Sequence, residues 1–215
     1  TNVESVDVSK NPELMILNIS ETKVTSVDVS NNPKLREFYC SHRGAYNSEY
    51  KFTSVDVSNN PDLLYFVCSG NKLTDIDISK NPKLQLLDVS DNYLSDIDLS
   101  NNKDLYQVYL NLNCMDFATL PLNPGTWNTY YYSQRPMKVD KSYPVNHEFD
   151  LSSRVLREES TTTCEMYAFS ETNPEEPVKL DRSYYSYSDG KVTLNKVYAD
   201  SVYFSFSNTL LNENV

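Results

Sequence analysis

Glycine and histidine are scarce in this chain, and their scarcity excludes several kinds of site. Only 4 glycines occur among 215 residues, so the sequence has no glycine-rich loop of the kind that cradles phosphate groups. The 2 histidines, His42 and His147, lie far apart, and none of the 4 cysteines forms a Cys-x-x-Cys pair. We therefore predict no metal site built on these residues. No apolar run approaches the roughly 20 residues that a membrane-spanning helix needs.

Positive charge is also in the minority. Lysine and arginine number 19 against 30 aspartates and glutamates, which leaves a formal net charge of -11. An acidic surface repels the phosphate backbone, so we expect no nucleic-acid partner. A hydrophobic content of 39% and a charged content of 23% are typical of folded domains, and the length has room for one large domain or two ordinary ones.

Catalytic motifs are missing as well. The sequence contains no Gly-x-Ser-x-Gly and no His-Glu-x-x-His. A nucleophilic serine or cysteine needs a base beside it, and two histidines offer few such bases. The carboxylate pairs Glu158–Glu159 and Glu175–Glu176 lie in polar segments, where solvated loop charge is the better interpretation. We predict that the protein is not an enzyme and needs no cofactor.

The sequence does contain a motif that repeats about every 21 residues. The pattern V-D-V-S-x-N begins at five positions: Val6, Val27, Val55, Ile76 and Ile97. A second phrase, L-x-x-L-x-L, follows each of them and is most regular in LQLLDVSDNYL, at residues 84–94. Alternating apolar residues point to one side of a short strand. One coil cannot bury that side alone, whereas stacked coils form a continuous core, so the period predicts a solenoid with a parallel sheet.

An asparagine recurs at one corner of every coil. The five are Asn11, Asn32, Asn60, Asn81 and Asn102. Because a buried amide must form hydrogen bonds, we expect these side chains to bind the backbone where the chain turns from one coil to the next. A second asparagine, in the L-x-x-N part of the repeat, is replaced by Thr22 in the first copy and displaced by an insertion in the second.

The residues between the inward leucines face outward and form columns along the sheet. The first column is Ile16, Glu37, Tyr65, Leu86 and Gln107, the second is Asn18, Tyr39, Val67, Asp88 and Tyr109, and the third is Ser20, Ser41, Ser69, Ser90 and Asn111. Exposed aromatic and aliphatic side chains indicate an interaction surface. The alternatives are that the sheet merely tolerates them or that the second half of the chain covers them. We predict the partner-binding residues Glu37, Tyr39, Tyr65, Val67, Leu86, Asp88, Gln107 and Tyr109.

The second repeat is seven residues longer than the others, because of an insertion at residues 43–51. It contains Arg43, Tyr46 and Tyr50, residue types that are frequent in binding hot spots. We predict that these three also bind the partner. The alternative is a tolerated insertion without a role, since lengthening a surface loop costs little.

One aspartate also recurs in each coil, at Asp7, Asp28, Asp56, Asp77 and Asp98. Carboxylates stacked about 5 Å apart repel one another, and Asp28, Asp56, Asp77 and Asp98 are therefore candidate ligands for a cation such as calcium. We favour the other interpretation, in which each aspartate accepts a hydrogen bond from a backbone N–H group in its own turn. A single column supplies too few oxygen ligands, so we predict no metal.

Cys40 and Cys68 are expected to be free, whereas a bridge between Cys114 and Cys164 is left open. Cys40 and Cys68 occupy the same inward position in adjacent coils, where parallel strands give poor disulfide geometry. We expect both to be buried thiols that pack as small apolar residues. Cys114 and Cys164 lie in different halves of the chain, and nothing in the sequence supports a bridge between them.

The 21-residue period is lost after Met115, and short β-branched or aromatic runs follow. They are TYYYSQ, MKV, HEFDLS, TTTCEMYAF, VKL, YYSYS, KVTL and SVYFSFS. Turn clusters separate them: NPEEP from Asn173, and Asp-Gly from Asp189, which predicts a two-residue hairpin. Such spacing predicts a β-sandwich. We therefore expect a solenoid domain over residues 1–116 and a sandwich domain over 117–215 that covers the open end of the last coil.

The start of the chain has no polar capping segment, because Val3 already occupies a repeat position. We expect that the native protein extends upstream, or that residue 1 is a processed or engineered end.

A short-period solenoid followed at once by a β-sandwich resembles the bacterial internalins and related leucine-rich-repeat surface proteins. The resemblance rests on five in-register copies over residues 3 to about 115. It implies a repeat sheet that binds a partner protein, an immunoglobulin-like domain that props or extends it, and a secreted protein or one on the extracellular face of a bacterial cell envelope. The implied role is adhesion or host-protein interaction.

Two alternatives to this role remain open. One is a structural spacer in a longer surface protein. The other is glycan binding by the tyrosines of the second half, since aromatic faces stack on sugar rings. These tyrosines are Tyr130, Tyr131, Tyr132, Tyr184, Tyr185 and Tyr187.

Overall fold

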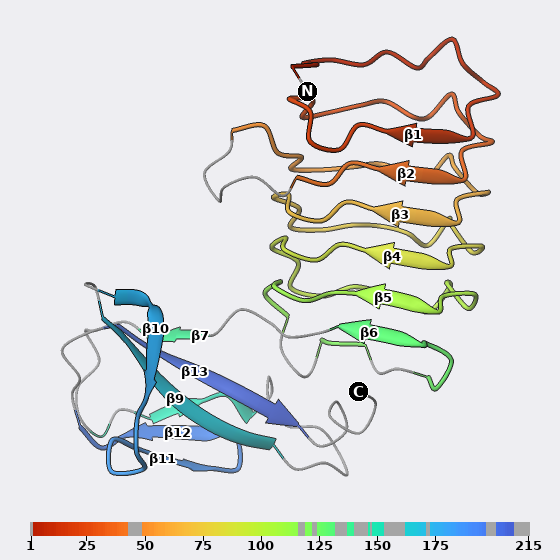
Figure 1. Cartoon of the computed structure of the whole chain (residues 1–215). Helices are drawn as coiled ribbons and strands as arrows, with labels where there is room; N and C mark the ends of the chain where they lie inside the picture. The colour runs from red at the N-terminus through yellow and green to blue at the C-terminus, as the bar shows by residue number, and fades with distance from the viewer. Residues whose placement is uncertain are drawn as a thin grey trace. The chain divides into compact units, whose positions relative to one another are not determined.

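The computed structural model divides the chain into two compact units (Figure 1). It describes residues 2–42, 49–115, 119–121, 124–131, 137–139, 146, 148–152, 162–170, 173–196 and 201–208. The first unit comprises Thr1–Met115 and Thr119–Gln134, and the second comprises Asp116–Ala118 and Arg135–Val215. That each unit folds as an independent domain stays a prediction.

The first unit is a β-solenoid whose coils each add one short strand to a parallel sheet (Figure 1). The strands are β1 (Ile16–Asn18), β2 (Glu37–Tyr39), β3 (Tyr65–Val67), β4 (Leu86–Asp88), β5 (Gln107–Tyr109) and β6 (Thr129–Tyr131). They lie in sequence order and pair at equivalent repeat positions. The predicted solenoid with turns of about 21 residues is confirmed.

The core of the solenoid is a stack of the apolar repeat positions. In the fourth coil, Leu84, Leu87, Val89 and Leu94 are all fully buried. The middle residue of each strand from β1 to β5 also points inward, because side chains alternate along a strand. All four cysteines are free, and the prediction of buried free thiols is confirmed for Cys40 and Cys68. Burial raises the pKa of the Cys40 thiol well above its ordinary value.

The corner asparagines form a ladder from coil to coil. Each of four side-chain amides donates from Nδ2 to two backbone carbonyl oxygens of the preceding coil, at distances between 2.7 and 3.1 Å. The four are Asn32, Asn60, Asn81 and Asn102, all buried. For these the prediction is confirmed. Asn11 differs: it is exposed, and no coil of the described chain precedes it to offer carbonyl oxygens to its side chain. Its own carbonyl oxygen accepts from Asn32, as the carbonyl oxygens of the later corner asparagines accept from the next coil.

A second ladder runs through the L-x-x-N asparagines. Asn71, Asn92 and Asn113 each accept a backbone N–H from the preceding coil at 3.0 Å. Each also donates to a carbonyl oxygen of that coil. Thr22, which replaces the asparagine in the first coil, donates to the Ile19 carbonyl oxygen at 2.7 Å.

The sixth strand corrects the boundary of the repeat sheet. The sequence pattern assigned TYYYSQ to the second half of the chain, but β6 pairs with β5 in parallel, with Gln107 opposite Thr129. Trp127 stands two residues before β6, where Leu105 stands two residues before β5. The sixth coil therefore lacks the leucine that made the other five recognisable, and backbone pairing with β5 maintains the sheet instead.

The described strands of the second unit form two antiparallel sheets (Figure 1). One has the order β10 (Asn173–Lys179), β9 (Thr162–Ser170), β13 (Ser201–Asn208) and β7 (Met137–Val139); the other has the order β11 (Tyr185–Ser188), β12 (Lys191–Leu194) and β8 (Glu148–Asp150). Both sheets contribute to one hydrophobic core. It contains Cys164, Met166, Leu180, Tyr185, Val192 and Leu194. An immunoglobulin-like sandwich is not evident in these strands.

The segment NPEEP was predicted to be a turn, and this is wrong. It lies inside β10, whose pairing with β9 shifts register between Asn173 and Val178. The strand is at the edge of its sheet. An edge strand tolerates Pro174 and Pro177 because a residue without an N–H donor can face away from the neighbouring strand.

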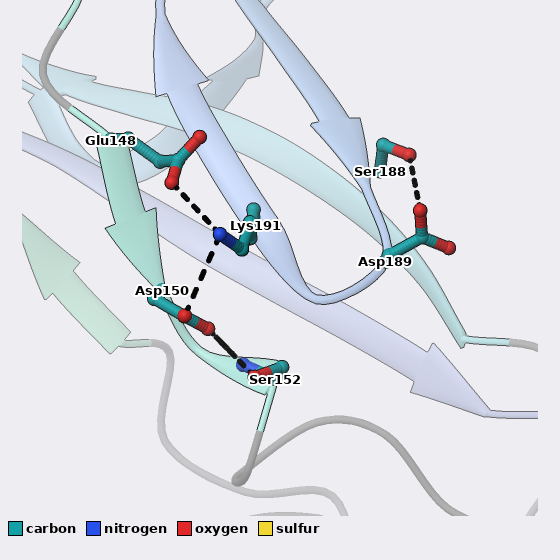
Figure 2. Close-up of polar contacts among 6 residues, drawn as sticks. All are labelled: Glu148, Asp150, Ser152, Ser188, Asp189 and Lys191. Atoms are coloured by element: carbon teal, nitrogen blue, oxygen red, sulfur yellow. Dashed lines mark hydrogen bonds and ion pairs between the residues drawn. The ribbon is translucent and has the colours of Figure 1, made fainter.

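The Asp-Gly hairpin between β11 and β12 is confirmed. Asp189 and Gly190 both have positive φ, at 49° and 78°, and Ser188 pairs with Lys191. The turn packs on Ser152, two residues after β8, since a Cβ added to Gly190 would meet the Ser152 Cα at 2.4 Å. Figure 2 shows the polar contacts beside it: the Lys191 ammonium lies 3.2 Å from Glu148 and 3.7 Å from Asp150.

Candidate functional site

The face of the solenoid sheet brings the predicted surface residues together. The register pairs Glu37, Tyr65, Leu86, Gln107 and Thr129 across neighbouring strands. It pairs Tyr39, Val67, Asp88, Tyr109 and Tyr131 in the same way. From β2 to β5 these residues are half-buried, while the residue between them in each strand is buried. All eight predicted sheet residues therefore lie on one face, which we call the sheet face; that they bind a partner stays a prediction.

Tyr39 and Glu37 form a polar pair at the first half of the sheet face. The Tyr39 hydroxyl donates to Glu37 Oε2 at 2.8 Å. Burial, together with this hydrogen bond and the negative charge of Glu37, raises the pKa of Tyr39 to about 12. The phenol therefore remains a neutral hydrogen-bond donor across the physiological pH range.

Tyr65 lies in the next coil and has a partner that sequence reasoning missed. A hydrogen bond with Tyr106 raises the pKa of Tyr65, and the Glu37 charge contributes in the same direction. Tyr106 precedes β5 by one residue and is half-buried. Its equivalents in the other coils, Arg36 and Gln85 among them, are not aromatic. The residues that precede the strands therefore show no aromatic pattern that would mark Tyr106. Its contact with Tyr65 also reaches from the fifth coil to the third.

The serines of the third column form hydrogen bonds with one another or with a residue of their own coil. The Ser69 N–H and hydroxyl both donate to the Ser41 Oγ, at 3.1 and 3.0 Å, and the Ser41 N–H donates to the Ser20 Oγ at 3.1 Å. Ser90 instead donates to Asp88 Oδ1 from its N–H at 3.0 Å and from its hydroxyl at 2.6 Å. The Asp88 carboxylate therefore accepts hydrogen bonds from Ser90, just after the end of its own strand.

The insertion is anchored by a buried histidine at its start. His42 Nε2 lies 2.8 Å from the Thr22 carbonyl oxygen, and Nδ1 lies 3.3 Å from the Cys40 carbonyl oxygen. These are the kinds of contact that Asn71 makes in the next coil. His42 therefore takes the place of the displaced asparagine, and Phe52, with 1% exposure, restores the apolar position after it.

The remaining insertion residues are only partly described. Tyr50 is half-buried, and the Lys23 ammonium lies 5.3 Å from its ring centroid, which ties the end of the insertion to the first coil. Arg43 and Tyr46 lie outside the described residues. Their predicted part in binding stays a prediction.

The aspartate column is confirmed as a set of turn acceptors. Asp7, Asp28, Asp56, Asp77 and Asp98 each accept the N–H of the serine two residues later, at 2.8 or 2.9 Å. These hydrogen bonds lower the pKa of every one of the five carboxyl groups. Within the described part of the chain, no group of three or more His, Cys, Asp or Glu side chains has an arrangement that could hold a metal ion.

The tyrosines of the glycan alternative are divided between the two units. Tyr130 and Tyr131 belong to β6 of the first unit, whereas Tyr184, Tyr185 and Tyr187 belong to the second; Tyr132 lies outside the described residues. Tyr185 is only 2% exposed, so its ring is not available to a sugar. Cations lie over two of these rings, Arg182 over Tyr185 and Lys196 over Tyr184, each at 4.7 Å from the centroid.

Comparisons with solved structures find internalins and another leucine-rich-repeat protein. Internalin C2 of Listeria monocytogenes is similar in structure, with a TM-score of 0.52 and 20% identity over 62% of this chain and 57% of that one. The functional domain of InlJ from the same organism, which includes a cysteine ladder, has a TM-score of 0.47 and 29% identity over 62% of this chain and 33% of that one. A leucine-rich-repeat protein of Leptospira interrogans has a TM-score of 0.46 and 19% identity, covering 60% of this chain and 33% of that one.

The first unit is a leucine-rich-repeat solenoid. Its turns of about 21 residues, its parallel sheet and its likeness to internalin C2 agree on that fold. The chain spans 57% or less of each of these three solved structures. No protein-family model and no curated protein matches the sequence. No helix among the described residues has the length and apolar character to cross a membrane.

Proposed function

We propose that the protein is a non-enzymatic binding module that holds a partner protein against the sheet face. The observation that carries the proposal is the row of half-buried aromatic and aliphatic side chains there: Tyr39, Tyr65, Val67, Leu86 and Tyr109. Solvent favours polar residues on an outward sheet face, and tyrosine combines a large apolar contact area with a hydrogen-bonding tip. Rigid coils hold these side chains in place, so little conformational freedom is lost on binding.

The setting that fits this role is the surface of a bacterium. The fold is shared with internalin C2, and the acidic net charge of -11 suits a soluble exterior. We propose a secreted or cell-surface protein that acts in adhesion or host-protein interaction, with the second unit as an immunoglobulin-like prop.

The test uses this chain, labelled, on an array of secreted and cell-surface proteins. A variant with Tyr39→Ala, Tyr65→Ala and Tyr109→Ala removes the aromatic contacts in the second, third and fifth coils. The matched control, Asn31→Ala, Asn59→Ala and Asn101→Ala, changes one exposed turn residue in each of the same coils. We expect the tyrosine variant to lose the partners that the wild type and the control retain. Equal binding by all three proteins would exclude the sheet face as the binding surface.

A further inference from the structure

We propose that the sheet face binds an arginine side chain of its partner, between the Glu37 carboxylate and the rings of Tyr39 and Tyr65. The inference rests on the proposed function, because it names the chemistry that the partner presents to that face. Two adjacent coils supply the three residues, with Glu37 and Tyr39 at the two ends of β2 and Tyr65 at the start of β3.

The three side chains lie close together. Glu37 and Tyr39 point to the same side of β2, and the Tyr39 hydroxyl reaches Glu37 Oε2 at 2.8 Å. Tyr65 is the register partner of Glu37 in the neighbouring strand, about 4.8 Å away.

The chemistry of this cluster fits a guanidinium group. An ionised carboxylate has about four acceptor positions, and among the described residues the hydroxyl of Tyr39 is the donor that reaches Glu37. A guanidinium can donate to the remaining positions while its plane stacks on a tyrosine ring. An ammonium group is more strongly hydrated and cannot stack, so arginine fits better than lysine.

The charge of the sheet face also favours a cationic partner. Its three outward columns contain the carboxylates of Glu37 and Asp88 and no lysine, arginine or histidine. Arg36 precedes β2, but it is exposed. A positive group from outside therefore complements the sheet face, and the half-buried setting strengthens the attraction.

The experiment is an NMR titration of the full chain, labelled with ¹³C in the tyrosine rings, by a capped Gly-Arg-Gly peptide. Tyr39→Phe and Tyr65→Phe assign the two signals. The same peptide with citrulline replaces the guanidinium by a neutral group of similar shape, and a lysine peptide tests the stacking argument. Two variants each remove one negative charge: Glu37→Gln within the cluster, and Asp96→Asn at an exposed position outside the sheet face.

We expect saturable shifts of the Tyr39 and Tyr65 signals with the arginine peptide and none with the citrulline peptide. Glu37→Gln should weaken binding by about tenfold or more, the loss of a charge-assisted hydrogen bond, while Asp96→Asn changes it by about twofold or less. Equal weakening by the two variants, equal binding of the lysine peptide, or the absence of shifts at saturating peptide would each overturn the proposal. If the array shows a protein partner that depends on the three tyrosines, the proposed function stands even when the arginine proposal fails. If the arginine peptide binds but the array shows no such partner, the proposed function is refuted instead.

Discussion

Replacing Asn81 by alanine removes one rung of the corner ladder and tests the physical basis of the solenoid. The Asn81 side chain is fully buried, and its Nδ2 donates to the carbonyl oxygens of Val57 and Asn60, each at 2.9 Å. Each net hydrogen bond is worth about 1 kcal/mol. Both carbonyl oxygens keep a backbone donor, at 3.1 Å in each case, so the full penalty of an unpaired group does not apply. We expect a loss of about 2–3 kcal/mol in the free energy of unfolding.

Two companion variants show whether that estimate has the right cause. Asn81→Asp keeps the shape but presents a carboxylate to the same two carbonyl oxygens, so we expect a loss of about 4 kcal/mol or more. Asn11→Ala removes the equivalent residue of the first coil, which is exposed, and should cost less than about 0.5 kcal/mol.

The assay is urea denaturation followed by circular dichroism, with free energies compared at a common slope. The reasoning fails if Asn81→Ala unfolds within about 0.5 kcal/mol of the wild type, or if Asn11→Ala is as destabilising as Asn81→Ala.

Two further predictions concern single-residue substitutions. Tyr39 should titrate near 12, and Glu37→Gln should move its pKa toward the ordinary value of 10.0, as read from the ¹³C signal of the ring. Because the folded state keeps this proton after the unfolded chain has lost it, the wild type should lose stability between pH 10.0 and about 12, and the variant less so; an unchanged pKa in the variant would contradict the contact. Gly190→Ala should destabilise the second unit by about 2 kcal/mol or more, because the added Cβ meets Ser152 at 2.4 Å, whereas Gly125→Ala, with similar φ and nothing within 4 Å, should cost about 1 kcal/mol. Equal costs for the two glycine variants, measured by thermal unfolding, would exclude the predicted clash.

Much of the structure of the first unit can be predicted from the sequence because each coil repeats the same pattern of apolar and polar residues. Five copies of one pattern identify the inward and outward residues. Because the coils stack in parallel, neighbouring strands pair at equivalent repeat positions. The columns of the sheet face and the turn role of the aspartates were predictable for that reason. In the second unit, the hairpin at Asp189 was predictable because a two-residue turn is a purely local feature.

Other features were decided by tertiary contacts that leave no repeated pattern. β6 lacks the leucine signature and is identified by its pairing with β5. His42 assumes an asparagine's place only because the folded chain brings the Thr22 carbonyl oxygen within 2.8 Å of its ring. Tyr106 joins the sheet face by reaching across a coil to Tyr65. The sequence alone determined the period, and with it which residues of each coil face solvent. Only the tertiary structure decided which of those residues touch, since side chains that meet across coils are far apart along the chain.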